Sequence, residues 1–314
     1  MRTWWLTAAA VLLVASCSKG VSPEMVDNDE VKAVSFSIAP FNICNEDART
    51  KTSIQTDNGE FYWAVKDTVG IYPDSGAQVY FVVEPGENAK VAKFNGGGWG
   101  FVETSTYYSY YPFIGNFYLD KRHIPVVYSG QKQTGTSTLT LNHIGNYDYM
   151  WALGNLSSDS DGKKLSFNYD HLNCIVHVDV TLPAGTYTKL AITAPSYLFT
   201  LRGHYDLTAA TPSIIADEYT TQMQIALEDV ILSKQTTFSV YMMLAPVDLN
   251  GKEITVSVLN GNKQELQCKK TPSRTYEAQK KYGLTCASWT EVPQSMGLII
   301  EDWGEGGSLI GTAN

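Results

Sequence analysis

Residues 172–180 read Leu-Asn-Cys-Ile-Val-His-Val-Asp-Val, and this stretch decides the class of fold. Its even-numbered positions are apolar, and most of its odd-numbered positions are polar. A period of two residues is typical of a β-strand with one face in the core, because successive side chains point to opposite faces of a sheet. Cys174 lies on the apolar face, so its thiol is predicted to point into the core.

Shorter strand patterns flank this stretch on both sides, and turns rich in Gly, Pro, Asn and Asp separate them. The chain has 19 Tyr, 11 Phe and 7 Trp, and aromatic residues favour strands. Many short strands at regular intervals indicate a sandwich or a barrel. The predicted strands are residues 34–38, 61–65, 69–72, 79–83, 91–94, 107–113 and 139–141 in the first half, and 172–180, 189–194, 204–207, 237–244, 254–259, 265–269, 282–286 and 296–303 in the second.

Helical periods are weak along the whole chain, and the pattern of residues 219–232 is ambiguous. Without helices between strands, the pattern argues against a parallel nucleotide-binding sheet. We therefore predict an all-β protein with two β-sandwich domains in tandem, residues 33–164 and 165–314. The boundary is placed in the polar stretch 157–164. Asn260-Gly261-Asn262 is predicted to form a hairpin turn.

Residues 1–16 have the composition of a signal peptide, with one Arg, an apolar run and then small residues. Val14-Ala15-Ser16-Cys17 is similar to the lipobox of bacterial lipoproteins, which predicts cleavage between Ser16 and Cys17 and a diacylglycerol on the Cys17 thiol. An ordinary secretory signal is the alternative. The apolar run is shorter than the roughly 20 residues of a membrane-spanning helix. Residues 17–32 are polar and acidic, and they are predicted to form a flexible tether.

The formal net charge is −9, so no basic surface for phosphates is expected and no nucleic-acid partner is predicted. Once Cys17 is acylated, the remaining cysteines are Cys44, Cys174, Cys268 and Cys286. Four cysteines allow three pairings. Buried free thiols and a bridge between Cys268 and Cys286 both fit the strand patterns, and the sequence leaves the pairing open.

Catalytic and metal-binding motifs do not emerge from the sequence. The five His residues have no metal-binding spacing, and His171 and His177 are predicted to share the polar face of one strand. Residues 159–162, Asp-Ser-Asp-Gly, begin like a calcium loop, but lysines follow where ligands are required. No nucleophile motif is recognisable. We therefore predict no enzyme activity, no metal and no cofactor.

Residues 107–113 read Tyr-Tyr-Ser-Tyr-Tyr-Pro-Phe. Aromatic rings have flat apolar faces, on which sugars can stack where the rings are exposed. One face of this strand must belong to the core, so only some rings would be free. These rings, or Trp99, would form the platform in an alternative function, that of a monomeric glycan-binding surface lipoprotein.

Several motifs, in their order along the chain, resemble those of the Bacteroidales fimbrillin-like family. After the lipobox they are Arg49-Thr50-Lys51-Thr52, residues 63–72 with Asp67 and Gly70, the aromatic strand that ends at Tyr111-Pro112, and residues 167–172, 242–246 and 300–307. The resemblance covers nearly the whole chain after the signal peptide. It implies two transthyretin-like β-sandwich domains and a non-catalytic structural or adhesive subunit of a type V pilus.

The resemblance also implies a route of assembly. In polymerising members, a trypsin-like protease cuts after an Arg near the N-terminus and removes the first strand, and a strand from another subunit then fills the groove. Here Arg49 is the candidate cleavage site, with Lys51 as a second tryptic position, and the candidate displaced strand contains Val34, Phe36 and Ile38.

The implied partners are other pilin subunits through strand donation, the outer membrane through the lipid anchor, and a host or microbial glycan or protein at the cell surface. The implied location is the outer membrane or cell surface, and the pilus after processing. The motifs do not distinguish a shaft, an anchor and a tip subunit.

Overall fold

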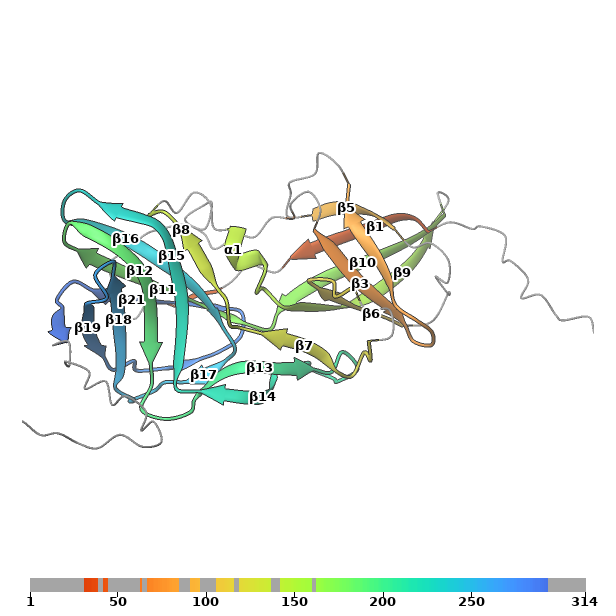
Figure 1. Cartoon of the computed structure of the whole chain (residues 1–314). Coiled ribbons are helices and arrows are strands. Elements are labelled where there is room, and N and C mark those ends of the chain that lie inside the picture. The colour runs from red at the N-terminus through yellow and green to blue at the C-terminus, as the bar shows by residue number, and fades with distance from the viewer. Residues whose placement is uncertain are drawn as a thin grey trace, which may run out of the picture.

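A computed structural model describes residues 31–38, 42–44, 63, 67–84, 91–96, 106–115, 119–136, 142–159 and 162–292 (Figure 1). Almost all regular structure in this part of the chain is β, and its one helix is the four-residue α1 (Asn142–Gly145). The predicted all-β class is confirmed. Other predictions lie outside the described residues: those for Ser16, Cys17, Arg49, Lys51 and Trp99, and the strands at 139–141 and 296–303.

The first group of strands forms a seven-stranded sheet that closes into a barrel. Each strand pairs with the next, and the last pairs with the first. In this order they are β1 (Val31–Ile38), β10 (Gly162–His171), β9 (Met150–Asp159), β6 (Tyr107–Tyr111), β3 (Thr68–Pro73), β4 (Val79–Val83) and β5 (Val91–Gly96). β1 begins at Val31, so the last two residues of the predicted tether belong to a strand.

Trp63 lies at the centre of the core of this closed sheet and is fully buried. Its ring packs edge-on against the rings of Phe94, Tyr111 and Tyr169, with centroids 5.0, 5.5 and 5.4 Å away. Aromatic pairs favour such T-shaped contacts, so this cluster binds three walls of the closed sheet together.

The second group of strands contains four further sheets around a larger core. A four-stranded sheet has the order β16 (Thr236–Leu244), β11 (Cys174–Leu182), β21 (Lys280–Cys286) and β2 (Asn42–Cys44). A six-stranded sheet has the order β22 (Thr290–Val292), β19 (Glu265–Lys270), β18 (Ile254–Asn260), β12 (Gly185–Thr193), β15 (Gln222–Leu232) and β8 (Lys132–Thr134). The smaller sheets are β14 (Ile215–Thr220), β13 (Phe199–Tyr205) and β7 (Ile124–Val127), and the pair β17 (Val247–Asp248) and β20 (Thr275–Tyr276).

The stretch 172–180 becomes β11, which begins at Cys174 and lies between β16 and β21. Its even-numbered residues from Cys174 to Val180 are buried, as predicted, but Ile175, His177 and Asp179 are buried too. His171 ends β10, and His177 lies in β11, with Leu172 and Asn173 between the two strands. The prediction that both histidines share one polar face is therefore wrong.

Residues 219–232, which were ambiguous in sequence, belong to β14 and β15. Met223, Ile225 and Leu227 are buried, but after Asp229 the buried positions are Val230 and Leu232. Asp229 has a positive φ of 56°, and the pairing of β15 with β12 shifts register here. An extra residue in a strand moves the side chains that follow it to the opposite face of the sheet. This bulge therefore interrupts the period-two spacing of the apolar residues, and the resulting spacing resembles that of a helix.

Within the polar stretch 157–164, residues 157–159 end β9 and residues 162–164 begin β10, and the two strands pair with each other, Gly162 with Asp159. The closed sheet therefore extends past the predicted boundary, to His171. Conversely, the buried residues Ile124, Val126 and Tyr128 pack in the core of the second group. The division into two transthyretin-like domains at residue 164 stays a prediction.

The described cysteines Cys174, Cys268 and Cys286 are buried free thiols. Cys268 and Cys286 lie in different sheets, and no disulfide joins them. Burial raises the pKa of Cys174 and of Cys286, which keeps both thiols protonated and unreactive. The hairpin predicted at Asn260-Gly261-Asn262 is confirmed, since β18 pairs with β19 directly across it.

Candidate functional site

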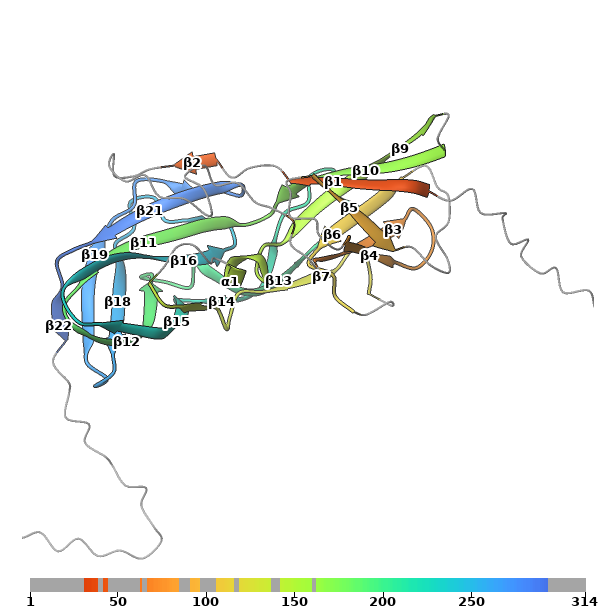
Figure 2. The same ribbon diagram turned by 90° about the horizontal axis from the view of Figure 1, so that it is seen from above.

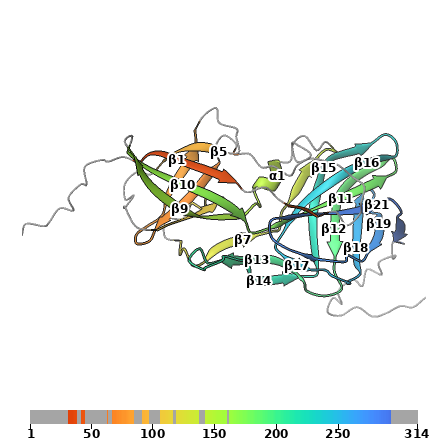
Figure 3. The same cartoon turned by 180° about the vertical axis from the view of Figure 1, so that it is seen from behind.

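β1 is the strand that closes the first sheet (Figure 3). It runs parallel to β10, with Val34, Phe36 and Ile38 paired to Leu165, Phe167 and Tyr169. On its other side it runs antiparallel to β5, with Phe36 paired to Ala92. β1 is therefore not an edge strand, and removal of its backbone would leave two open edges facing each other.

The two strands beside β1 carry core residues along the whole register. Leu165, Phe167 and Tyr169 of β10 are 0–2% exposed, and Ala92 and Phe94 of β5 are 1% and 4% exposed. The register therefore pairs positions 34, 36 and 38 of β1 with three core residues of β10. A strand between β5 and β10 would thus form backbone hydrogen bonds with both neighbours. It would also need an apolar residue at every second position.

A second short strand follows β1 at once. β2 runs parallel to β21, with Asn42, Ile43 and Cys44 paired to Lys280, Lys281 and Tyr282, and it covers one edge of the four-stranded sheet (Figure 2). β1 and β2 thus belong to one N-terminal segment that contributes to both groups of strands. The sequence patterns had not predicted β2, because three residues are too few to show a period.

β16 is the opposite edge of the same sheet. Its free backbone groups form hydrogen bonds with buried side chains instead of with another strand. The Gln131 amide donates to the Met243 carbonyl and accepts from the Met243 N–H, both at 2.8 Å. Gln133 donates to the Ser239 carbonyl and accepts from the Tyr241 N–H, both at 2.9 Å. The two glutamines are 2% and 1% exposed, and we call them the amide cap.

His143 of α1 completes the protection of β16. Its Nε2 lies 3.1 Å from the Tyr241 carbonyl oxygen, to which the ring N–H donates. Burial lowers the pKa of this imidazole, which favours the neutral ring. Sequence reasoning missed these groups because a polar residue near a turn is normally exposed, and their partners are more than 95 residues away.

The aromatic run at 107–113 does not form an exposed platform. Tyr107 and Tyr111 face the core of the closed sheet, and Tyr110 packs in the other core, where its ring stacks 6.1 Å from that of Tyr72. Burial raises the pKa of Tyr110 to about 12. β6 is therefore a wall between two cores, and the run holds the two groups of strands together.

Among the described residues, none of the helices has the length and apolar character needed to cross a membrane. The arrangement of the site is that of an all-β protein in which a segment near the N-terminus closes sheets at two places.

Comparison with known proteins gives the family. A family model described as fimbrillin-like matches residues 50–303, which is most of the sequence. The chain belongs to the fimbrillin-like family. A search of curated proteins found no match.

Solved structures show a similar fold. A proposed cell adhesion protein of Bacteroides ovatus has a TM-score of 0.51 and 12% identity, over 84% of this chain and 96% of its own. A second, from Bacteroides uniformis, has a TM-score of 0.51 and 16% identity, over 72% and 88%. The tip fimbrial protein Mfa3 from Porphyromonas gingivalis, truncated at the C-terminus, has a TM-score of 0.35 and 9% identity, over 75% and 95%. The first two likenesses concern the fold alone, and the third is too distant to support an argument.

Proposed function

We propose that this chain is a non-catalytic pilus subunit that joins other subunits by strand exchange. The observation that carries the proposal is the position of β1, which alone connects β5 to β10 and closes the sheet. Family membership and the fold of proposed cell adhesion proteins support the same conclusion. Adhesion, assembly into a pilus and a location at the cell surface follow from this proposal.

In the proposed mechanism, a protease cuts after Arg49. Both β1 and β2 precede this residue, so one cut would separate both strands from the rest of the chain. β1 leaves a slot between β5 and β10, and β2 leaves an open edge on β21. Unpaired backbone groups at sheet edges favour the addition of another strand, which a second subunit would supply.

The lipid on Cys17 fits the same proposal. A chain anchored through Cys17 would stay at the outer membrane until the cut after Arg49, which separates the anchor and β1 from the subunit together. Without that cut the chain would remain a surface lipoprotein. The anchor would then hold the chain at the outer membrane before assembly. Its removal would coincide with the opening of the slot between β5 and β10.

The glycan-binding alternative has lost its main support. Tyr107, Tyr110 and Tyr111 are at most 9% exposed, so the run 107–113 cannot present a flat row of rings. Trp99, the other candidate, lies outside the described residues.

Limited trypsin digestion followed by size-exclusion chromatography with light scattering tests the proposal. The wild-type chain should be cut before residue 52 and should form a ladder of oligomers. Arg49→Ala combined with Lys51→Ala should leave the N-terminal segment attached and the protein monomeric. Arg274→Ala, at an exposed position before β20, is the matched control and should behave as wild type. A ladder in the double variant, or a cut wild-type chain that stays monomeric, would contradict the proposal.

A further inference from the structure

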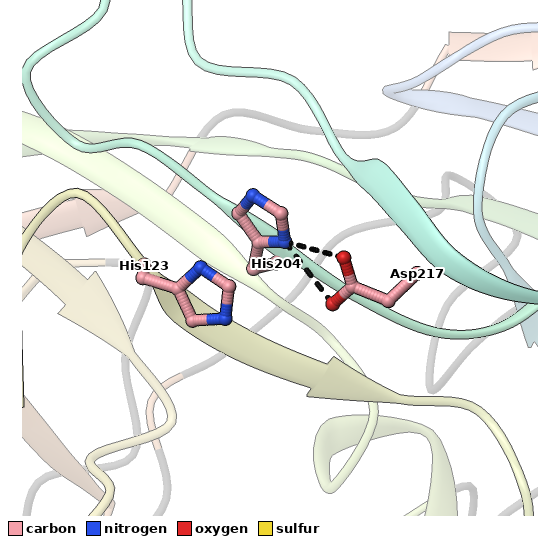
Figure 4. Close-up of side chains that lie close together, drawn as sticks. All are labelled: His123, His204 and Asp217. Carbon is pink, nitrogen blue, oxygen red and sulfur yellow. Dashed lines mark hydrogen bonds and ion pairs between the residues drawn. The ribbon is translucent and has the colours of Figure 1, made fainter.

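Three side chains in or directly beside the small sheet of β7, β13 and β14 come together on the surface (Figure 4). His123 precedes β7, His204 lies in β13, and Asp217 lies in β14. One possible ligand atom from each residue lies within 4.8 Å of the other two. His204 and Asp217 are 13 residues apart and His123 is much farther away, so no local spacing in the sequence reveals the cluster.

Backbone features of these strands hold the cluster in place. β14 approaches β13 closely at Gly203, where a Cβ atom would lie 2.3 Å from the Ile215 carbonyl oxygen. The pairing of β13 with β14 also shifts register beside this glycine. The His123 N–H donates to the Asp120 carbonyl at 2.8 Å, which fixes the turn before β7. His204 and Asp217 therefore face His123 from neighbouring strands.

The contacts among the three side chains are already close to those of a metal site. The Nδ1 atom of His204 lies 2.9 and 3.1 Å from the two carboxylate oxygens of Asp217. The rings of His123 and His204 are stacked with centroids 3.8 Å apart. Ligand atoms around a tetrahedral zinc ion are separated by about 3.3 Å, since each lies about 2.0–2.1 Å from the metal. His123 is exposed, and we expect its ring to rotate on metal binding so that a nitrogen turns toward the other two ligand atoms.

We propose that His123, His204 and Asp217 bind a divalent first-row transition-metal ion such as Zn²⁺. Two imidazoles and one carboxylate are ligands that zinc, copper and nickel prefer, whereas calcium and magnesium prefer oxygen ligands. Three protein ligands leave a fourth position for water or for a group from outside. On binding, the metal takes the place of the hydrogen atom between His204 Nδ1 and Asp217, and the neutral imidazole then carries its proton on Nε2.

Such an ion would fix the segment that connects the two groups of strands. The segment before β7 contacts the closed sheet: the Tyr72 hydroxyl donates to the Leu119 carbonyl at 2.6 Å, and Lys121 Nζ donates to the Asp74 carbonyl at 2.5 Å. His204 and Asp217 belong to the second group. The ion would therefore hold the connecting segment onto β13 and β14 and stabilise the folded chain as any ligand of the native state does.

Titration calorimetry of the tag-free, metal-stripped chain with ZnCl₂ tests the site. The wild-type chain should bind one Zn²⁺ ion with a micromolar or tighter Kd, and equal concentrations of Ca²⁺ or Mg²⁺ should not compete. His123→Gln, His204→Gln and Asp217→Asn should each weaken binding at least tenfold. Glu218→Gln, the adjacent exposed carboxylate on β14, is the matched control and should bind as wild type.

Thermal unfolding and Co²⁺ absorption spectra distinguish binding at this site from nonspecific binding and from misfolded variants. Saturating Zn²⁺ should raise the Tm of the wild type and of Glu218→Gln by several degrees, but not that of the three ligand variants, while all five proteins should unfold alike without metal. Co²⁺ should give the visible absorption bands of a tetrahedral site only where Zn²⁺ binds. Absence of saturable binding by the wild type, or binding that the ligand substitutions leave intact, would overturn the proposal.

Discussion

The two edges of the four-stranded sheet differ in how they are protected. At the β16 edge, Gln131 and Gln133 satisfy the backbone with side chains that are fully buried in the fold. At the β21 edge, the three residues of β2 provide the cover, and they belong to the N-terminal segment that also contains β1. An exposed sheet edge invites pairing with other chains. One edge is thus protected by side chains inside the fold, and the other by a segment that the cut proposed after Arg49 would remove.

The largest expected effect is the loss of the amide cap. Gln131→Leu combined with Gln133→Leu would remove the four hydrogen bonds to β16 and a fifth from Gln131 to the Tyr128 carbonyl. It would leave buried backbone groups of Ser239, Tyr241 and Met243 without these partners. Each orphaned buried group costs about 1–3 kcal/mol, so the free energy of unfolding in urea should fall by at least about 3 kcal/mol.

Lys132→Ala is the matched control for the amide cap. Lys132 lies between the two glutamines on β8, and its ion pair with Glu228 is exposed at 3.3 Å. Exposed ion pairs contribute about 0–1 kcal/mol, so this substitution should change stability little. Equal losses in the control and the double variant would show that β8 protects β16 through its backbone position and not through the two amides.

A second, smaller effect concerns the strand between the two edges. The His177 ring stacks on Tyr241 of β16 at 5.7 Å, and Gly283 of β21 leaves room for it. Burial and, to a smaller extent, nearby Lys281 lower the pKa of His177 to about 4, and Asp179 acts in the opposite direction. The unfolded chain binds a proton near pH 6.5, so the contribution of His177 to stability is complete above about pH 6.5 and is lost as pH falls toward 4.

Unfolding in urea between pH 7.5 and pH 4 measures this effect. A pKa that is lower by this amount corresponds to about 3 kcal/mol at the acidic end, because each pKa unit corresponds to about 1.4 kcal/mol. His177→Gln should flatten the loss of stability in this range. Parallel pH profiles for wild type and variant would mean that other groups are responsible for the acid sensitivity of the sheet.

The smallest effect is expected at β2. Ile43→Pro should disrupt the pairing of this strand with β21, because proline lacks the N–H donor and fits poorly inside a strand. Only three residues are paired, so the free energy of unfolding should fall by no more than about 1 kcal/mol. Ile43→Val is the control. If Ile43→Pro lowered the free energy of unfolding as much as the amide-cap variant does, the two edges would be equally important for stability, and the contrast between them would be wrong.

The sequence predicted the parts of this fold that depend on period-two patterns. The alternation of apolar residues correctly located most strands of the second half, and also β1, β3, β4, β5 and β6. β10 was missed although Leu165, Phe167 and Tyr169 alternate in its sequence, because the polar residues beside it suggested a linker. The bulge at Asp229 hid β15, since it exchanges the two faces of the strand.

The candidate sites were harder to predict, for a physical reason. The role of β1 depends on two neighbours that come from distant parts of the chain, and a strand pattern does not say which strands it pairs with. Gln131 and Gln133 are polar residues that sequence alone would assign to the surface. Their burial depends on hydrogen bonds to β16, which is more than 100 residues away in the sequence. His123, His204 and Asp217 likewise meet only when three strands are in register.

Competition by a synthetic peptide of residues 31–38 tests the central claim most directly. Trypsin-cut protein is incubated with excess peptide, or with a scrambled peptide of the same composition, and its oligomeric state is measured by light scattering. If β1 fills the slot between β5 and β10 that assembly requires, the peptide should bind one per chain and suppress the oligomers, and the scrambled peptide should do neither. Oligomers that form equally well in the presence of either peptide would contradict the account.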